Sequence, residues 1–480
     1  EIIKMNEPKN IKPIFHFEHK EICEKYEIDF NRIERYGLCL NDITKMTDEE
    51  IAEVAKNGDK DALEYILNLG KKLGFRTKNI DGYCGYIEFG EGEEIVGIIG
   101  HLDVVPEGEG WIHEPFGGII EDGKIFGRGA IDDKGPVIAS LYAMKAVMEQ
   151  TKANKRVRLI LGLNEERNWK CIDYYKKHEE WPTIGFSPDA DFPCIYAEKG
   201  LLTVYLKQNY SNNRDIIITN IDCNNNAINV VPKYCKIDLK VNSDKINKQE
   251  LINYAKQKIA TNNFNIEIQE NEGISLITHG ISSHAAHPDL GKNAISMALV
   301  IVNDILQKYN EGVEILEKFS ELIGMQYNGE ALGINKEDES GKLTLNVGNC
   351  KIEQDKISIG INLRIPITIG INEIEADFQK NISGNLDVSF EGRKEPLYIS
   401  KDNELIQILC DTFNEVTGNN EMPIAIGGAT YARAFQNCVS FGANMPGDKD
   451  MCHQVDEFIK IDNLITSCQI YAEAIDKLIK

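Results

Sequence analysis

The sequence lacks long hydrophobic runs: no apolar stretch in its 480 residues approaches the roughly 18 to 20 residues that cross a bilayer. Its opening, "EIIKMNEPKN", lacks the basic start and apolar core of a signal peptide. No CxxC pair occurs among the 12 cysteines, which are scattered along the chain. Scattered cysteines in a long chain are typical of reduced thiols and not of a disulfide framework. We therefore expect a cytoplasmic protein that does not enter a membrane.

Positive charge is scarce: the sequence has 53 Lys and Arg but 76 Asp and Glu, which gives a net charge of −23 at pH 7. An acidic surface repels phosphate backbones and anionic lipids, so nucleic acid and membranes are not expected partners. The contents of 42% hydrophobic and 27% charged residues are those of a globular protein. The length indicates roughly two to four domains.

The order of predicted elements indicates an α/β domain interrupted by an insert. Apolar runs predict strands, and apolar spacings of three and four predict helices; the strands are 85–89, 95–99 and 156–163, and the helices are 59–75 and 135–150. The alternation of strands and helices favours a sheet in which some strands pair in parallel. Residues 204–396 change to an α+β pattern, and the α/β pattern returns afterwards. We predict one discontinuous domain of residues 1–203 and 397–480, with helix in residues 1–48, and an inserted domain of residues 204–396.

Polar residues end one of these strands abruptly in "IVGIIGHLDVVPEGEGW". His101 and Asp103 follow the apolar run, where open α/β sheets bind ligands, and both residue types bind zinc and related ions. A turn in which His101 and Asp103 only cap the backbone is the alternative.

Further clusters of acidic residues and histidine occur at predicted strand ends or in loops. They are Asp132 and Asp133 in "GRGAIDDKGP", Glu165 and Glu166 in "LNEERNW", Asp189 and Asp191 in "FSPDADFP", and His453 in "MCHQ". Each alone could be a helix start or a solvated turn. Together, adjacent carboxylates that repel one another indicate a site for a pair of divalent cations.

These motifs, together with "GGATYARAF", resemble in order and spacing the metallopeptidase family of aminoacylases, glutamate carboxypeptidase and carnosinase. The resemblance covers roughly residues 59–480 and is strongest to PepV-type (Xaa-His) bacterial dipeptidases. It implies an α/β fold: a zinc-peptidase-like catalytic domain with a mixed sheet flanked by helices, interrupted by an inserted α+β lid domain.

The resemblance also implies a ligand set for two Zn²⁺ ions per chain, with Mn²⁺ or Co²⁺ as alternatives. The implied ligands are His101, Asp132, Glu166, Asp189 and His453. Asp132 would bridge the ions, His101 and Glu166 would hold one of them, and Asp189 and His453 the other.

Other roles are implied in the same way. Glu165 would be the general base, and Asp103 would orient His101. In the insert, His284 of "GISSHAAHP" would stabilise the oxyanion, Asn229 of "NAINVVP" would contact the substrate, and Arg364 of "GINLRIP" would bind its carboxylate.

The expected activity is hydrolysis of unblocked dipeptides by a monomer, with a dimer as the alternative. An N-acyl amino acid deacylase or a tripeptidase on the same dimetal site is the competing interpretation. A metal-binding protein without turnover is disfavoured, because binding alone needs no free base such as Glu165. Two departures from the family pattern are Cys452, where methionine is usual and a thiol could compete for metal, and Ala429, where glycine is expected.

Overall fold

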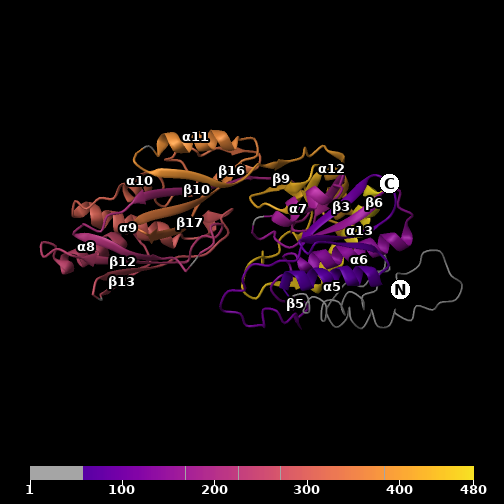
Figure 1. Ribbon diagram of the computed structural model, residues 1–480, viewed down its shortest axis with the longest axis horizontal. Helices are drawn as coiled ribbons and strands as arrows, with labels where there is room; N and C mark the ends of the chain where they lie inside the picture. Colours follow the sequence, from indigo (N-terminus) through magenta and orange to yellow (C-terminus); the bar gives the residue numbers. More distant parts are fainter. Residues whose placement is uncertain (1–57, 168, 225, 271, 383) are drawn as a thin grey trace. The chain divides into compact units, whose positions relative to one another are not determined.

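The computed structural model describes residues 58–480 except residues 168, 225, 271 and 383. The helix expected in residues 1–48 lies outside the described residues. The described chain forms two compact units, which we call unit 1 and unit 2 (Figure 1). Unit 1 comprises residues 58–196, Ile399–Ile424 and Thr430–Lys480, and unit 2 comprises Ala197–Tyr398 and Ala425–Ala429.

Unit 1 is built on a mixed sheet with the strand order β1–β2–β6–β3–β7–β22. The strands are β1 (Arg76–Ile80), β2 (Cys84–Phe89), β3 (Ile95–His101), β6 (Arg156–Gly162), β7 (Ile184–Ser187) and β22 (Cys438–Ser440). β3 runs parallel to β6 and to β7, and β7 runs parallel to β22, whereas β2 is antiparallel to both β1 and β6. The predicted parallel pairing is confirmed.

Helices cover both faces of this sheet: α5 (Gly58–Lys72), α6 (Lys134–Gln150), α7 (Lys170–His178), α12 (Glu404–Thr417) and α13 (Ile461–Leu478). Ile99 of β3 packs with Ile172 of α7, whereas the next residue, Gly100, faces Val137 of α6. A Cβ atom at Gly100 would lie 2.5 Å from the Val137 side chain, so glycine is what allows α6 to approach β3. The expectation of a mixed sheet flanked by helices is confirmed.

The short strand pairings in unit 1 are one local hairpin and two pairings between segments that are distant in sequence. β5 (Lys124–Phe126) pairs with β4 (Ile119–Glu121) and β24 (Phe458–Lys460), and β8 (Ala190–Asp191) pairs with β23 (Ala443–Asn444). A short 3₁₀ helix, η3, spans Tyr431–Ala434. Where the chain passes between the units lie β9 (Ile195–Glu198), β20 (Leu397–Tyr398) and β21 (Ile424–Ile426).

Unit 2 contains two antiparallel four-stranded sheets with the orders β17–β18–β10–β19 and β11–β12–β14–β13. The first has β10 (Gly200–Asn209), β17 (Thr344–Glu353), β18 (Lys356–Ile365) and β19 (Asp387–Lys394). The second has β11 (Ile216–Asp222), β12 (Tyr234–Val241), β13 (Ile266–Glu270) and β14 (Ile274–His279).

One large hydrophobic core unites the sheets and helices of unit 2. The helices are α8 (Lys248–Asn262), α9 (Ala294–Lys308), α10 (Glu314–Leu322) and α11 (Ile371–Asn381), with the 3₁₀ turn η2 (Pro288–Leu290). The ribbon of β15 (Glu337–Asp338) and β16 (Gly341–Lys342) completes the unit, which is of the α+β type. None of the helices in the described part of the chain combines the length and the apolarity that a membrane span requires.

Candidate metal centre

Three parallel strands carry polar residues, at or just after their carboxyl ends, to one edge of the sheet of unit 1. His101 is the last residue of β3, Glu165 and Glu166 follow β6, and Asp189 follows β7. β3 lies between β6 and β7, so these side chains reach the same carboxyl edge from neighbouring strands. Asp132 joins them from the turn before α6. The strand order therefore brings together in space residues that are far apart in the sequence.

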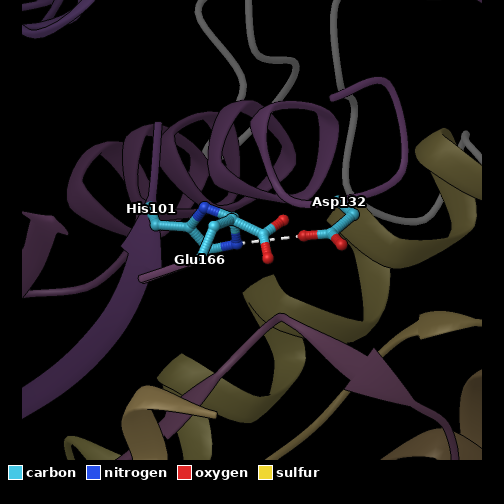
Figure 2. A group of neighbouring side chains, drawn as sticks. All are labelled: His101, Asp132 and Glu166. Atoms are coloured by element: carbon cyan, nitrogen blue, oxygen red, sulfur yellow. Dashed lines mark hydrogen bonds and ion pairs between the residues drawn. The ribbon is translucent and has the colours of Figure 1, made fainter. Parts of the chain in front are cut away.

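Asp132 lies between two histidines and uses a different oxygen for each. His101 Nε2 is 3.0 Å from Asp132 Oδ1, and His453 Nε2 is 2.9 Å from Asp132 Oδ2. His101 Nε2 is also 3.5 Å from Asp189 Oδ2, and His453 Nε2 is 3.0 Å from Glu166 Oε1. Figure 2 shows His101, Asp132 and Glu166 pointing toward one another, and the potential ligand atoms of these three lie within 4.8 Å of each other. This is the arrangement expected of a bridging carboxylate.

The main chain fixes which nitrogen of His101 faces the carboxylates. Nδ1–H donates to the backbone carbonyl of Asp103 at 2.9 Å, because a carbonyl can only accept. Nε2 is therefore the nitrogen that faces Asp132 and Asp189. A neutral Nε2 and a carboxylate oxygen are both acceptors, so this contact needs either a proton or a cation between the two atoms.

The pKa values of the buried histidines and of Asp189 show that the site favours bound positive charge. Burial alone would lower the pKa of His101, but the surrounding carboxylates, Asp189 foremost, raise it well above its usual value. Burial alone would also lower the pKa of His453, but the contacts with Asp132 and Glu166 raise it well above its usual value. Burial, followed by the charge of Asp132, raises the pKa of Asp189 to about 7. Divalent cations would neutralise the negative charge that these buried carboxylates share. Imidazole nitrogens and carboxylate oxygens are suitable ligands for such ions. The donor set therefore fits the implied ions.

The shortest side-chain contacts pair these residues in another way than the resemblance implies, which groups His101 with Glu166 and Asp189 with His453, although ligand atoms of His101 and Glu166 also lie within 4.8 Å of each other. His453 instead contacts Glu166, and His101 contacts Asp189. The physical reason is that β3 has β6 on one side and β7 on the other, so both acidic residues are near His101. The position of His453 decides between them, and no sequence pattern reports that position.

Asp103 contacts His101, which it is expected to orient, and it also holds the loop after β6. Its carboxylate oxygen lies 3.5 Å from His101 Nδ1, farther than its own backbone carbonyl. The same carboxylate accepts the backbone N–H groups of Glu165 at 2.9 Å and Glu166 at 3.2 Å. Burial would raise the pKa of Asp103, but His101 and these amides lower it below its usual value. Asp103 thus ties the loop after β6 to the end of β3.

Glu165 lies beside the ligands. A carboxylate oxygen of Glu165 is within 4.8 Å of ligand atoms of both His101 and Asp189. The backbone of Glu165 is held on both sides, because its N–H donates to Asp103 and its carbonyl accepts Trp169 Nε1–H at 2.9 Å. The carboxylate is therefore placed by the main chain at the rim of the ligand cluster.

Cys452 does not join the ligand cluster. Asn444 Nδ2 donates to its sulfur at 3.8 Å, and burial raises the pKa of the thiol well above its usual value. Among the described residues, the groups that could hold an ion do not include Cys452.

Unit 2 brings its candidate residues together by backbone pairing. Val230 pairs with His284, and the N–H of Ala285 donates to the carbonyl of Asn229 at 2.9 Å. Arg364 lies opposite Thr344 in the β17–β18 pair, and Thr344 Oγ1 donates to the carbonyl of Ala285 at 3.2 Å. Asn229, His284 and Arg364 thus belong to one region of unit 2.

Arg364 is more enclosed than a simple surface anchor for a carboxylate. It is 4% exposed, its Nε–H donates to Asn362 Oδ1, and its Nη1–H donates to the carbonyl of Gly427, both at 2.9 Å. These bonds fix the plane of the guanidinium.

Three buried residues around the ligands had no role predicted from the sequence, although Asp133 was noted there in an acidic cluster. Asp133 accepts the N–H of His101 at 3.1 Å and so ties the end of β3 to the start of α6. Arg128 and Glu457 form a buried ion pair. The available signals were the second acid of "DD" and a glutamate that closely follows His453 before an apolar strand.

Comparison with known proteins identifies the family. Residues 97–477 match peptidase family M20/M25/M40. The chain is 37% identical over 472 residues to YtjP of Bacillus subtilis (strain 168), covering 96% of this chain and 99% of that protein. It is 34% identical over 428 residues to the Beta-Ala-Xaa dipeptidase of Lactobacillus delbrueckii subsp. lactis, covering 88% and 90%.

The fold is shared with solved structures of lower sequence identity. Human carnosine dipeptidase 1 has a TM-score of 0.58 at 14% identity, with 94% of this chain and 98% of that chain covered. The resemblance inferred from the sequence motifs is confirmed, and the chain belongs to peptidase family M20/M25/M40.

Proposed function

We propose that the protein is a metal-dependent dipeptidase that hydrolyses unblocked dipeptides. Membership of peptidase family M20/M25/M40 and similarity to a Beta-Ala-Xaa dipeptidase support this proposal. The observation that carries it is the Asp132 carboxylate, whose two oxygens lie 3.0 Å and 2.9 Å from Nε2 of His101 and His453.

Two groups of side chains would each hold one divalent ion, with Asp132 shared between them. His101 and Asp189 form one group, and His453 and Glu166 form the other. Zn²⁺ suits this set of nitrogen and oxygen ligands, and Mn²⁺ or Co²⁺ can also occupy it. Bound ions would polarise the scissile carbonyl and lower the pKa of a nearby water molecule.

Glu165 would serve as the general base, taking a proton from the attacking water and passing it to the leaving amine. Two features support this role: its carboxylate lies beside the ligand cluster, and its backbone is anchored to Asp103 and Trp169. Rigid placement matters because proton transfer requires the base to be within hydrogen-bond reach of the water.

Unit 2 would supply substrate contacts. His284 would donate to the developing oxyanion, Asn229 would contact the substrate backbone, and Arg364 would pair with the free carboxylate. A guanidinium held in one plane, as Arg364 is, suits bidentate pairing with a carboxylate.

Replacement of His284 with alanine should lower kcat for dipeptide hydrolysis by about a hundredfold to a thousandfold, the usual cost of losing one oxyanion donor. Metal content should not change, because His284 is not among the ligands. Steady-state kinetics with elemental analysis check both expectations. His287→Ala is the matched control, because the described bonds of His287 use only its main chain. A kcat of His284→Ala equal to that of the control would exclude the oxyanion role.

A substrate panel distinguishes a dipeptidase from the alternative activities. The panel contains a free dipeptide, the same dipeptide as its C-terminal amide, a tripeptide and an N-acyl amino acid. The free dipeptide should have the highest kcat/KM, and the amide should be poor because it cannot form the ion pair with Arg364. Faster cleavage of the N-acyl amino acid or of the tripeptide would favour the deacylase or tripeptidase interpretation instead.

A further inference from the structure

A buried ion pair connects the two loops that carry Asp132 and His453. Arg128 Nη1–H donates to Glu457 Oε2 at 2.6 Å, and the two residues are 3% and 0% exposed. Arg128 lies just after β5 and Glu457 directly before β24. The antiparallel β5–β24 pairing, together with the bond from Gly127 N–H to the Glu457 carbonyl, sets the two residues side by side.

The second carboxylate oxygen of Glu457 holds the turn that ends at Asp132. Oε1 accepts the backbone N–H groups of Gly129 at 3.1 Å, Ile131 at 3.0 Å and Asp132 at 3.2 Å. The main chain of the bridging residue is therefore fixed directly by a charged side chain that is more than 300 residues away in sequence.

The guanidinium of Arg128 reaches the main chain of the loop after β3 and of the loop that carries His453. Its Nη2 donates to the carbonyl of Glu107 at 3.1 Å and to that of His453 at 3.4 Å. His453 has a backbone φ of 64°, a left-handed conformation that residues other than glycine rarely adopt. A bond to its carbonyl helps to hold this conformation, which determines where the imidazole points.

Stability alone does not account for such a pair. Removing two charges from water is costly, and buried ion pairs are often no more stabilising than well-packed apolar side chains of similar volume. The bonds of this pair, in contrast, converge on the main chain of two metal-ligand residues. An apolar pair would fill the volume but would offer no acceptor to the amides of the turn before α6.

We propose that Arg128 and Glu457 are positioning residues that fix Asp132 and His453 relative to each other and thereby set the affinity of the site for divalent ions. The inference rests on the proposed function, since it assumes that Asp132 and His453 bind metal. Neither residue is assigned as a ligand or as a group that touches substrate.

The test is a zinc titration of metal-free, full-length protein against a chromophoric chelator. Glu457→Gln keeps the shape of the side chain and one acceptor oxygen but loses the charge that pairs with Arg128. Its dissociation constant for Zn²⁺ should rise about 10-fold to 100-fold, the usual effect of altering a group that orients a ligand. At saturating zinc, KM for a dipeptide should stay close to the wild-type value.

Glu88→Gln is the matched control, because Glu88 also forms a buried ion pair with an arginine in the same unit. Arg158 Nε is 2.6 Å from Glu88 Oε2, and the two residues are 2% and 6% exposed. Arg158 lies in the first half of β6, whereas Glu165 and Glu166 follow the other end of that strand. Glu88→Gln should lower the thermal unfolding midpoint but leave zinc affinity unchanged.

The outcomes separate the inference from the proposed function. Wild-type zinc affinity in Glu457→Gln, or an equal loss in Glu88→Gln, would overturn the positioning role. If Glu457→Gln does not fold, Arg128→Lys decides, because it keeps the charge but loses the fork that reaches Glu107 and His453. Weaker zinc binding by that variant supports the inference, and wild-type binding overturns it. A wild-type protein that binds no divalent ion contradicts the proposed function itself.

Discussion

Replacement of Glu165 with glutamine should lower kcat for dipeptide hydrolysis by about a hundredfold to ten-thousandfold, the range attributed to a general base. The amide keeps the size of the side chain and its place beside His101 and Asp189 but cannot accept the proton. The backbone anchor to Asp103 does not involve the side chain, so the loop should keep its position. Elemental analysis should therefore find an unchanged metal content.

Glu166→Gln is a demanding control, because it makes the same chemical change one residue away. Glu166 Oε1 is 3.0 Å from His453 Nε2, which places Glu166 among the ligands. This variant should lose metal, and its activity should recover in part when excess metal is added. The opposite result, with Glu165→Gln stripped of metal and still active, would mean that the two glutamates have been assigned the wrong way round.

The parts of the site with a local signal could be predicted from the sequence. The apolar run that becomes β3 ends at His101, and the run that becomes β6 ends just before Glu165 and Glu166. A polar residue directly after a buried strand stands out in the sequence, and the strand alternation indicates the edge to which it belongs. β7 was not predicted, because four residues, "IGFS", are too few to show a period.

The parts that depend on distant segments could not be predicted in this way. Glu457 and Arg128 are 329 residues apart, and only the β5–β24 pairing makes them neighbours. The division of the ligands depends equally on where the loop before β24 carries His453. Arg364 was predicted as a substrate anchor, but its bond to the Gly427 carbonyl depends on a segment 63 residues further along the chain.

Removal of metal should abolish activity and make the protein easier to unfold. Ions that bind the folded chain stabilise it by mass action, so the thermal unfolding midpoint of the metal-free protein should be lower. Metal affinity should fall as the pH falls, because protons compete for the histidine nitrogens. The carboxylates raise the pKa of His101 and His453 well above the usual value in the metal-free protein, so this competition should extend to neutral pH.

The most direct measurement is the hydrolysis of a free dipeptide by protein whose metal content is determined in the same sample, before and after chelation. The account predicts about two divalent ions per chain in the active protein, as in other two-metal hydrolytic sites. Activity should disappear with those ions and return when Zn²⁺ or Mn²⁺ is added back. Full activity in protein that elemental analysis shows to be free of metal would contradict it.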